Sequence, residues 1–397
     1  MRISTANAYD SGIDSLVRRQ SELAEMQDKM TSGKRVAKAS DDPAAAARAE
    51  RALASISRIE TSKRAVEASN VVMTQTESSL GAAGDILQRA RELMVSAGNA
   101  TYTDAERASI AGELRTLREQ LFTIANQSDG AGTYLFGGQG ATQKPFVDAP
   151  GGVQYAAVGG QIRTEAGTNL PLTTDGQAAW LSARTGNGVF VTSAAGVTGA
   201  TIDSGSVSDP SALTGSDYSL SFSVSGGVTT YAVLRDGLPT AVTAAPYVSG
   251  QPIVVDGMTV AVSGAPASGN QFRLAPSTPS LSVFATLDKA ITGLQTTGRT
   301  GSQIVQATSE NLRDIDSVMG TLQTARAAAG EVLNRIESET GRLDDQKLAS
   351  ETERMNAEDV DMVHAISEFQ NKQSGYDAAL KSYAMVQRLS LFQYVNG

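Results

Sequence analysis

The sequence predicts an α+β multidomain protein: an elongated coiled-coil bundle of long helices is formed by both chain ends, and a β-rich domain is inserted between them. In both flanks of the 397-residue chain, apolar residues recur with heptad-like spacing, as in helices packed at shallow angles. Between 145 and 278 the chain has only 12 charged residues but 19 of its 38 glycines. Pro145, Pro276 and Pro279 mark the edges of that segment.

These boundaries predict three domains. Residues 1–42 and 360–397 form a terminal helical pair. Residues 43–144 and 279–359 form a long-helix bundle, and residues 145–278 form the inserted outer β-rich domain. Helices before and after the insertion each carry an apolar stripe to bury, so they should pack together and bring both chain ends to the same place.

The N-terminal flank carries clear helix signals. A long helix should start at Asp42-Pro43, an N-cap followed by proline in the first turn, and run to about Ala97. Its apolar positions recur every seven residues: Ile59, Val66, Met73, Leu80, Leu87 and Met94. A third helix opens at Thr103, with Glu106 completing a capping box. The turn at 97–102 predicts that these two helices are antiparallel.

The C-terminal flank repeats this pattern. One register holds Leu312, Ile315, Met319, Leu322, Ala329, Leu333, Ile336 and Leu343. Asn356 is expected to cap a last helix, with Asp359 in its first turn.

The middle segment predicts strands. Tyr218, Leu220, Phe222 and Val224 alternate with serines, as in a half-buried strand. Asp256-Gly257 between two β-branched runs indicates a hairpin with a type I′ turn. Trp180, the one tryptophan, is expected to anchor the core of this module.

The terminal helices are predicted to form an assembly interface. A two-helix pair has little stability of its own, so we expect it to order when copies pack together. The residues expected in this interface are Ile13, Leu16, Leu23, Val363, Ile366, Phe369, Tyr376, Leu380, Tyr383, Leu391 and Phe392. Asp42 and Pro43 are expected to act as the cap and hinge next to it.

Composition argues against several partners. The net charge is −9, from 33 basic and 42 acidic residues, whereas nucleic acids and anionic membranes attract basic patches. There is no cysteine, so disulfides and thiolate chemistry are excluded. We find no apolar run of about 18 residues and no apolar core of a secretory signal near Met1. A short apolar end, from Leu389 to Val395, is a weak membrane candidate.

Each motif that could form a catalytic, cofactor or metal site fits a structural role better. Asp41-Asp42 fits a helix cap better than a metal site. The glycines of 137–140 lack the Gly-Lys-Ser/Thr of a phosphate loop and fit a flexible exit from the bundle. His364 is the one histidine and fits a surface or intersubunit position better than a triad or zinc site. We therefore expect no enzyme activity, no cofactor and no metal.

Several motifs at both ends resemble the family of bacterial flagellins and flagellar hook-associated proteins. They lie at residues 1–5 (MRIST), 27–36, 39–45 (ASDDPAA), 89–93 and 124–126. The stretches 132–138 (GTYLFGG) and 144–146 and the ending 390–394 (SLFQY) look more like a hook–filament junction member than filament flagellin. The resemblance covers about residues 1–146 and 285–397.

This resemblance implies a non-enzymatic structural subunit of the extracellular flagellum. It implies export unfolded through the flagellar type III apparatus without a cleaved signal peptide, and a cytoplasmic export chaperone. It further implies self-association in a ring-like layer, between another hook-associated protein on the hook side and flagellin on the filament side. The terminal helical pair, residues 1–42 with 360–397, would be an axial core that lines the export channel.

Two alternatives stay open. One is filament flagellin itself, which residues 134–138 argue against. The other, from a different class, is a coiled-coil signalling or binding module with a β insert, which predicts a membrane span or a ligand pocket.

Overall fold

A computed structural model describes residues 2–99, 101–140, 142–164, 169–194, 197 and 199–395. The chain divides into two compact units. Unit 1 comprises Met1–Arg64 with Thr340–Gly397, and unit 2 comprises Ala65–Glu339. Two long helices, α2 (Pro43–Ala97) and α6 (Gly301–Glu358), contribute residues to both units.

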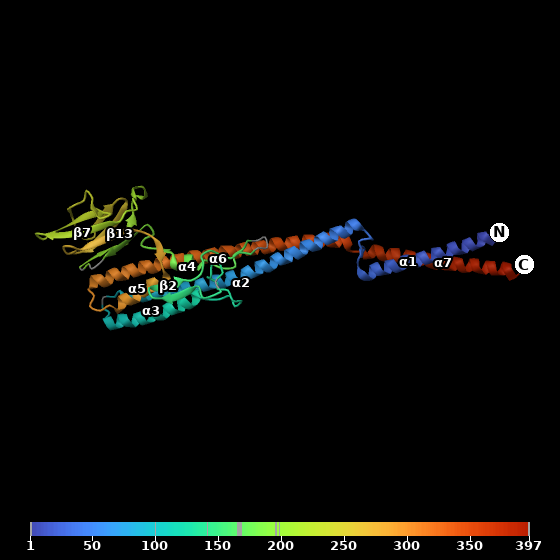
Figure 1. Ribbon diagram of the computed structural model, residues 1–397, viewed down its shortest axis with the longest axis horizontal. Coiled ribbons are helices and arrows are strands. Elements are labelled where there is room, and N and C mark those ends of the chain that lie inside the picture. Colours follow the sequence, from blue (N-terminus) through green and yellow to red (C-terminus); the bar gives the residue numbers. More distant parts are fainter. Residues whose placement is uncertain are drawn as a thin grey trace. The chain divides into compact units, whose positions relative to one another are not determined.

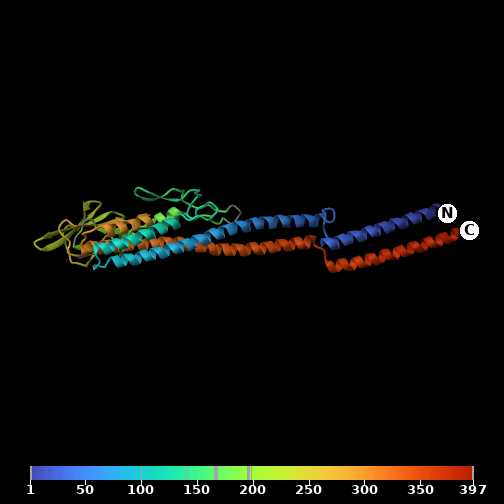
Figure 2. The ribbon, with the colours of Figure 1, turned by 90° about the horizontal axis from the view of Figure 1, so that it is seen from below.

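In its described residues, unit 1 contains two helix pairs, joined by a segment with the isolated β-bridge between Lys34 and Asp359. Helices α1 (Arg2–Ser32) and α7 (Met362–Val395) lie side by side, with the two chain ends together (Figures 1 and 2). The other pair is the start of α2 and the end of α6. Ion pairs join Lys63 to Asp344 and, at 3.1 Å, Lys347 to Glu60. The residue numbers rise on one helix as they fall on the other, so this pair is antiparallel.

The heptad positions of the long helices are confirmed as buried. On α2 these are Ile59, Val66, Met73, Leu80, Leu87 and Met94. On α6, Ile315, Leu322, Ala329, Ile336 and Leu343 also recur every seven residues and are buried. The other predicted members of this register, Leu312, Met319 and Leu333, are half-buried. The apolar spacing in the sequence therefore identified the packed face of each helix.

Unit 2 contains a helical part and a β module. Its helical part adds α3 (Asp104–Ala125) and α5 (Val283–Gln295) to the remaining lengths of α2 and α6. The predicted capping box at Thr103 is confirmed: its hydroxyl accepts from Glu106 N, and the Glu106 carboxylate accepts from Thr103 N at 2.7 Å. Helix α3 is antiparallel to α2, as predicted, because Arg89 pairs with Glu113 and Ser79 with Gln127. Helix α5 is an element that the apolar spacing in the sequence does not distinguish from its neighbours.

The β module is built from two larger sheets. The first has the order β10-β8-β7-β13-β4, with β9 beside β8, and the second has the order β11-β12-β5, with β6 beside β12. The first sheet contains β4 (Phe190–Ala194), β7 (Tyr218–Ser225), β8 (Val228–Arg235), β9 (Leu238–Pro239), β10 (Ala245–Pro246) and β13 (Gln271–Pro276). The second contains β5 (Ala200–Ile202), β6 (Ser206–Val207), β11 (Pro252–Val255) and β12 (Met258–Gly264).

One short element, the 3-10 helix η1 (Pro210–Ala212), lies within this module, between β6 and β7. The other short elements lie between the module and the helices. They are β1 (Phe146–Ala149), β2 (Gly152–Tyr155), α4 (Gly176–Leu181), β3 (Ala183–Arg184) and β14 (Pro279–Leu281). The pairings β1 with β2 and β14 with β3 are antiparallel. The two connections to the large sheets, near 184 and 279, therefore run together as a ribbon.

Most strand predictions are confirmed. Tyr218, Leu220 and Phe222 of β7 are buried in the core of the module, whereas Val224 is exposed near the end of the strand. The hairpin between β11 and β12 turns at Asp256 and Gly257, whose φ angles are 39° and 79°. Positive φ at both positions is what a type I′ turn requires.

The prediction for Trp180 is wrong. Trp180 lies on α4 and stacks on Phe284 of α5, with ring centroids 5.9 Å apart and an interplanar angle of 7°. It also meets Phe136 edge-on at 5.4 Å. The core of the large sheets is a separate cluster around Phe190, Phe222 and Phe272. The size of a tryptophan side chain indicates that it will be buried, but not in which of the two cores it will lie.

Two further local predictions need correction. Asn356 does not cap the last helix, because α6 continues to Glu358, and Asp361 caps α7 by accepting from Val363 N and His364 N. The glycines after Phe136 are not a flexible exit. Gly137 and Gly138 are buried, and a Cβ on Gly138 would lie 2.1 Å from the carbonyl oxygen of Val158. Here glycine permits close backbone packing.

Candidate assembly interface

The terminal pair of unit 1 is antiparallel along its length. The carboxylate of Glu22 lies 4.0 Å from Lys372 Nζ. A Cβ on Gly12 would lie 3.4 Å from the ring of Tyr383, and a Cβ on Gly375 would lie 2.9 Å from Arg19 Nη1. In each of these pairs the residue number on α1 falls by as much as the number on α7 rises, within one residue. The register between the two antiparallel helices is therefore constant. The two glycines let large side chains of the opposite helix approach closely.

The predicted interface residues share these two helices but differ in exposure. Ile13, Val363, Ile366 and Leu380 are exposed, and Val363 is the most exposed at 82%. The half-buried members are Leu16, Leu23, Phe369, Tyr376 and Tyr383. Leu391 and Phe392 belong to α7, but their side chains lie outside the described residues. One terminal pair thus buries only part of its apolar stripe.

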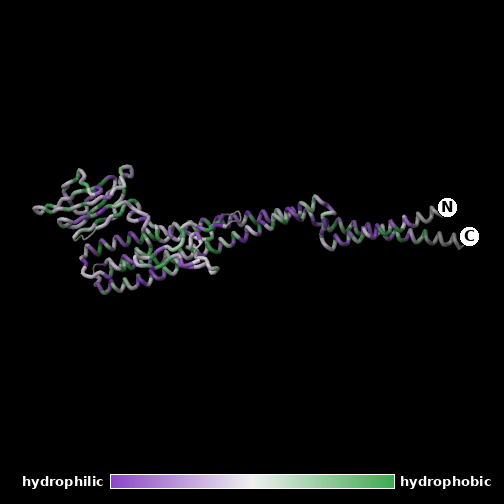
Figure 3. Tube along the Cα trace, in the orientation of Figure 1, coloured by the Kyte–Doolittle hydropathy of each residue, from purple (hydrophilic) through white to green (hydrophobic). Residues whose placement is uncertain are grey.

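Sequence reasoning missed the most buried residues of this pair. Met26 on α1 is 7% exposed, and Ala365 on α7 is 2% exposed. Met26 is three residues after Leu23 and four before Met30, so the 3-4 spacing could have revealed it. A single alanine such as Ala365 carries no comparable signal. Figure 3 shows polar and apolar residues interspersed along both helices.

The predicted cap at Asp42 is present at the start of α2. Its Oδ1 accepts from Ala44 N at 3.1 Å and Ala45 N at 2.9 Å, and Pro43 is the first helical residue. The hydrogen bond from Ala45 N, followed by that from Arg35, holds the pKa of the Asp42 carboxyl below its ordinary value. Asp41 is a second local acceptor, for Ala37 N and Lys38 N.

The segment before this cap is tied to the end of α6. Arg35 N and Val36 N donate to the Glu358 carbonyl at 2.7 and 3.2 Å, and Val360 N donates to the Gly33 carbonyl. The Arg35 guanidinium donates to the Ala357 carbonyl at 2.8 Å. Backbone hydrogen bonds therefore hold the segment between α1 and α2 against the segment between α6 and α7. A joint of this kind fixes the register of both helix pairs of unit 1.

A buried carboxylate supports the same joint. The side chain of Glu358 is 9% exposed and lies 3.3 Å from Lys34 Nζ and 3.5 Å from Arg354. Two cationic partners compensate for the loss of hydration of this carboxylate. Asp42 and the Glu358 cluster together make residues 33–42 and 357–361 an ordered joint.

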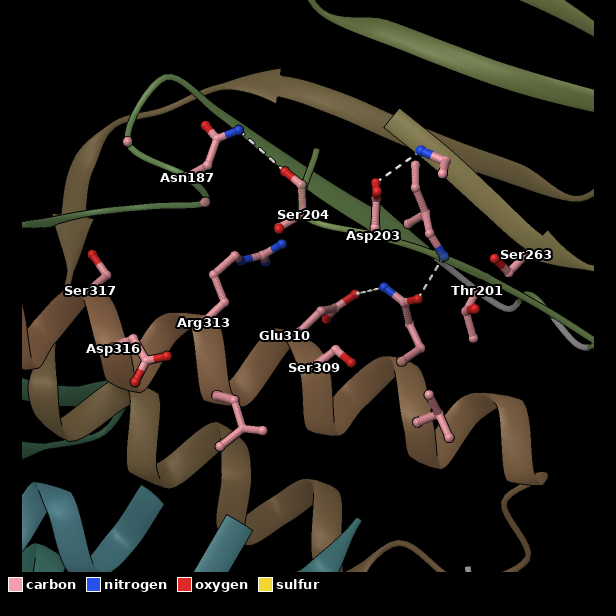
Figure 4. A pocket seen from close by; sticks show the side chains of 17 residues that line it. Asn187, Thr201, Asp203, Ser204, Ser263, Ser309, Glu310, Arg313, Asp316 and Ser317 are labelled. Carbon is pink, nitrogen blue, oxygen red and sulfur yellow. Dashed lines mark hydrogen bonds between the residues drawn. The ribbon is translucent and has the colours of Figure 1, made fainter. Parts of the chain in front are cut away.

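A second candidate site is a polar cleft of about 830 Å³ in unit 2, between α6 and the β module (Figure 4). Most of its polar groups already bond within the protein. Gln306 Oε1 accepts from Ile202 N at 2.9 Å, and its Nε2 donates to Glu310. Arg313 donates to the hydroxyl of Thr192 at 3.1 Å. These contacts hold the β module on α6.

Within the described residues, no group of three or more histidine, aspartate or glutamate side chains could hold a metal ion. No helix within that part of the chain is long and apolar enough to cross a membrane. His364 is exposed on α7, 3.9 Å from Glu368.

Comparison with known proteins agrees with this division into helical ends and a β module. The family model for the bacterial flagellin N-terminal helical region matches residues 3–141, and that for the flagellin C-terminal helical region matches residues 312–395. The chain belongs to the flagellin and hook-associated protein family. A third model, the D2-like domain of flagellar hook-associated protein 1, matches residues 191–276. The β module is thus similar to a domain of that hook-associated protein.

Three members of the family illustrate the similarity. Flagellar hook-associated protein 3 of Escherichia coli K12 is 25% identical, over 99% of both chains. Flagellar hook-associated protein 3 of Salmonella typhimurium is 36% identical over 154 residues, which span 38% of this chain and 48% of that protein. The crystal structure of the flagellar junction protein FlgL from Legionella pneumophila is 27% identical, with a TM-score of 0.65 over 71% of this chain and 97% of that one.

These similarities confirm the fold class and the resemblance to hook-associated protein 3. Long helices come from both chain ends, and antiparallel sheets are inserted between them. This family member is accordingly a structural component of the flagellum.

Proposed function

We propose that this protein is the subunit that joins the flagellar hook to the filament. The observation that carries the proposal is the similarity to hook-associated protein 3 over 99% of both chains, together with a hook-associated D2-like module between flagellin-like ends. In this proposal, copies form a ring-like layer. Another hook-associated protein lies on the hook side, and flagellin lies on the filament side.

The assembly interface in this proposal is the terminal helical pair, residues 1–42 with 360–397. Its support is the exposed apolar side chains of Ile13, Val363, Ile366 and Leu380 on a pair of only two helices. Burial of such side chains against neighbouring copies would stabilise both helices and the assembly. Residues 43–144 with 279–359 would then form the surrounding bundle, and 145–278 the outer module.

Delivery to this position would use the flagellar export apparatus without a cleaved signal peptide, aided by a cytoplasmic chaperone. The chain would reach the extracellular end of the growing hook unfolded. Its chemistry is compatible with this route, since it has no cysteine to form disulfides. No catalytic step, cofactor, metal, nucleic acid or membrane takes part in this proposed function.

Filament flagellin is the alternative within the family. The two can be separated by complementation of cells that lack this protein. A junction subunit is needed in few copies, and its loss should release flagellin monomers to the medium. Restored retention of flagellin by the wild-type gene would support the junction proposal. Loss of flagellin synthesis itself, with no flagellin in cells or medium, would instead support a filament subunit.

A further inference from the structure

The paired sections of α2 and α6 in unit 1 carry opposite net charge. From Pro43 to Arg64, α2 has five basic and two acidic residues. From Thr340 to Glu358, α6 has five acidic and three basic residues. The pair packs through positions such as Ala49, Ala52, Leu343 and Ala357, which are buried. The face of each helix that points away from its partner remains uncovered. The section of α2 has a basic excess, and the section of α6 has an acidic excess.

The outward face of α6 forms an open groove of about 670 Å³. Its lining includes Leu348, which is 63% exposed, and the small residue Ala349. The carboxylates of Asp345 and Glu353 line it eight residues apart, and Arg48 contributes the one basic side chain among the lining residues. An exposed leucine between two carboxylates suits a partner that offers small apolar side chains flanked by cations.

The outward face of α2 has this composition. Ala47, Arg51, Ala54 and Arg58 follow one another at intervals of four, three and four residues, so they form one stripe along the helix. All four are exposed. The two arginines are seven residues apart, or about 10.5 Å along the axis, and the two carboxylates on α6 are about 12 Å apart.

We propose that the α2 stripe of a second copy of this chain docks in the α6 groove. The inference rests on the proposed function, because it assigns the surfaces through which copies associate in the layer. If neighbouring copies point the same way, α2 of one copy meets α6 of the next in the antiparallel sense, as it does within the chain. Arg58 then meets Asp345 while Arg51 meets Glu353.

This pairing fixes the relative height of the two copies. Within the chain, Lys63 pairs with Asp344, so Arg58 lies at the level of residue 349. Between copies, Arg58 pairs with Asp345 instead, which is a shift of four residues or about 6 Å along the helix. The neighbour thus lies beside the first copy at nearly the same height.

The contact is heterologous, since it joins two different surfaces. Each copy keeps a free groove on one side and a free stripe on the other, so association continues from copy to copy until a ring or a shallow helix forms. Exposed ion pairs contribute little affinity each, but opposite charges select the partner surface and set its register. Burial of Leu348 would supply the apolar part of the contact.

Disulfide cross-linking tests the register, because the chain has no cysteine of its own. We would express Ala54→Cys/Ala349→Cys as the sole copy in motile cells, isolate flagella and oxidise them mildly. Both positions are exposed, and oxidised monomer compared with and without reductant controls for a bond within one chain. The expected result is a ladder of dimers, trimers and larger species. The matched control, Ala47→Cys/Ala349→Cys, moves one cysteine by seven residues and should give no ladder.

The other outcomes are equally decisive. Monomers alone, in flagella that contain the variant, would overturn the docking while leaving the proposed function intact. Dimers without larger species would also overturn it, because they indicate a two-fold contact. Absence of even the wild-type protein from flagella would overturn the proposed function, and with it the assembly on which this docking depends.

Charge reversal tests the identity of the partner. Arg51→Glu/Arg58→Glu and Asp345→Lys/Glu353→Lys should each prevent incorporation, although circular dichroism should find both monomers folded. Expressed together, the two variants should restore incorporation, since each offers the surface that matches the other. Failure of the folded mixture to incorporate would show that a second copy is not the occupant.

Discussion

At the scale of single residues, the joint of unit 1 depends on a few polar contacts. Asp42 caps α2, Arg35 donates to the carbonyl of Ala357, and the Glu358 carboxylate lies between Lys34 and Arg354. The cap was readable from sequence, because aspartate before proline has a local meaning. The partners of Arg35 and Glu358 were not readable, since they come from the opposite end of the chain.

The cap at Asp42 predicts an acid-sensitive step. The folded protein holds the pKa of this carboxyl below its ordinary value, so the ionised cap stabilises the folded state above that ordinary value, about 3.9. The contribution is lost as the pH falls through the lowered pKa. Asp42→Asn keeps a capping oxygen without a titrating group. We expect hydrogen exchange at Ala44 and Ala45 to accelerate with acid more in the wild type than in this variant; equal acceleration would contradict the cap.

The position of Trp180 predicts what its fluorescence reports. It stacks on Phe284, whereas Val262 is buried in the separate core of the large sheets. Phe284→Ala should therefore shift the emission of the native protein, because it opens a cavity beside the indole, and should cost about 3–5 kcal/mol of unfolding free energy. Val262→Ala should destabilise the β module without shifting that emission. If only Val262→Ala shifted the fluorescence emission, Trp180 would belong to the core of the large sheets, which would contradict this account.

At the scale of elements, the long helices were the most predictable part of the fold. A seven-residue repeat of large apolar residues is a property of each helix alone, so Leu80 and Leu87 could be assigned to a packed face before any contact was known. The same applies to the Asp256-Gly257 hairpin, whose turn chemistry is local. Sheet order was not predictable, because β13 pairs with β7 and β4 from distant parts of the sequence.

The candidate assembly interface was only partly predictable for the same reason. The stripe on the terminal helices follows from spacing, but the close approach at Gly12 and Gly375 depends on which residue faces each glycine. Asn356 was misread as a cap because asparagine is also tolerated inside a helix, and only the backbone shows that α6 continues past it. The groove around Leu348 required the fold, since its lining residues are defined by exposure.

The terminal pair predicts the effect of a truncation. Deletion of residues 378–397 removes the part of α7 that pairs with the first half of α1, including Leu380 and Tyr383. Unit 2 contains none of these residues, so its helices and β module should remain folded by circular dichroism. Incorporation into flagella should be abolished, whereas removal of residues 396–397 alone should be tolerated. If the protein without residues 378–397 still joined hook to filament, the C-terminal part of α7 would have no role in assembly.

At the scale of the whole molecule, helical ends and inserted module have different relations to the family. The ends match the flagellin models, and the module matches a hook-associated D2-like domain. The charge asymmetry of α2 and α6 in unit 1 adds a way for copies of this chain to meet side by side.

The central claim is that this protein joins hook to filament, and electron microscopy of cells that lack it tests the claim most directly. The account predicts hooks without filaments, with filaments restored by the wild-type gene. Filaments of normal length on hooks in cells without the protein would contradict it.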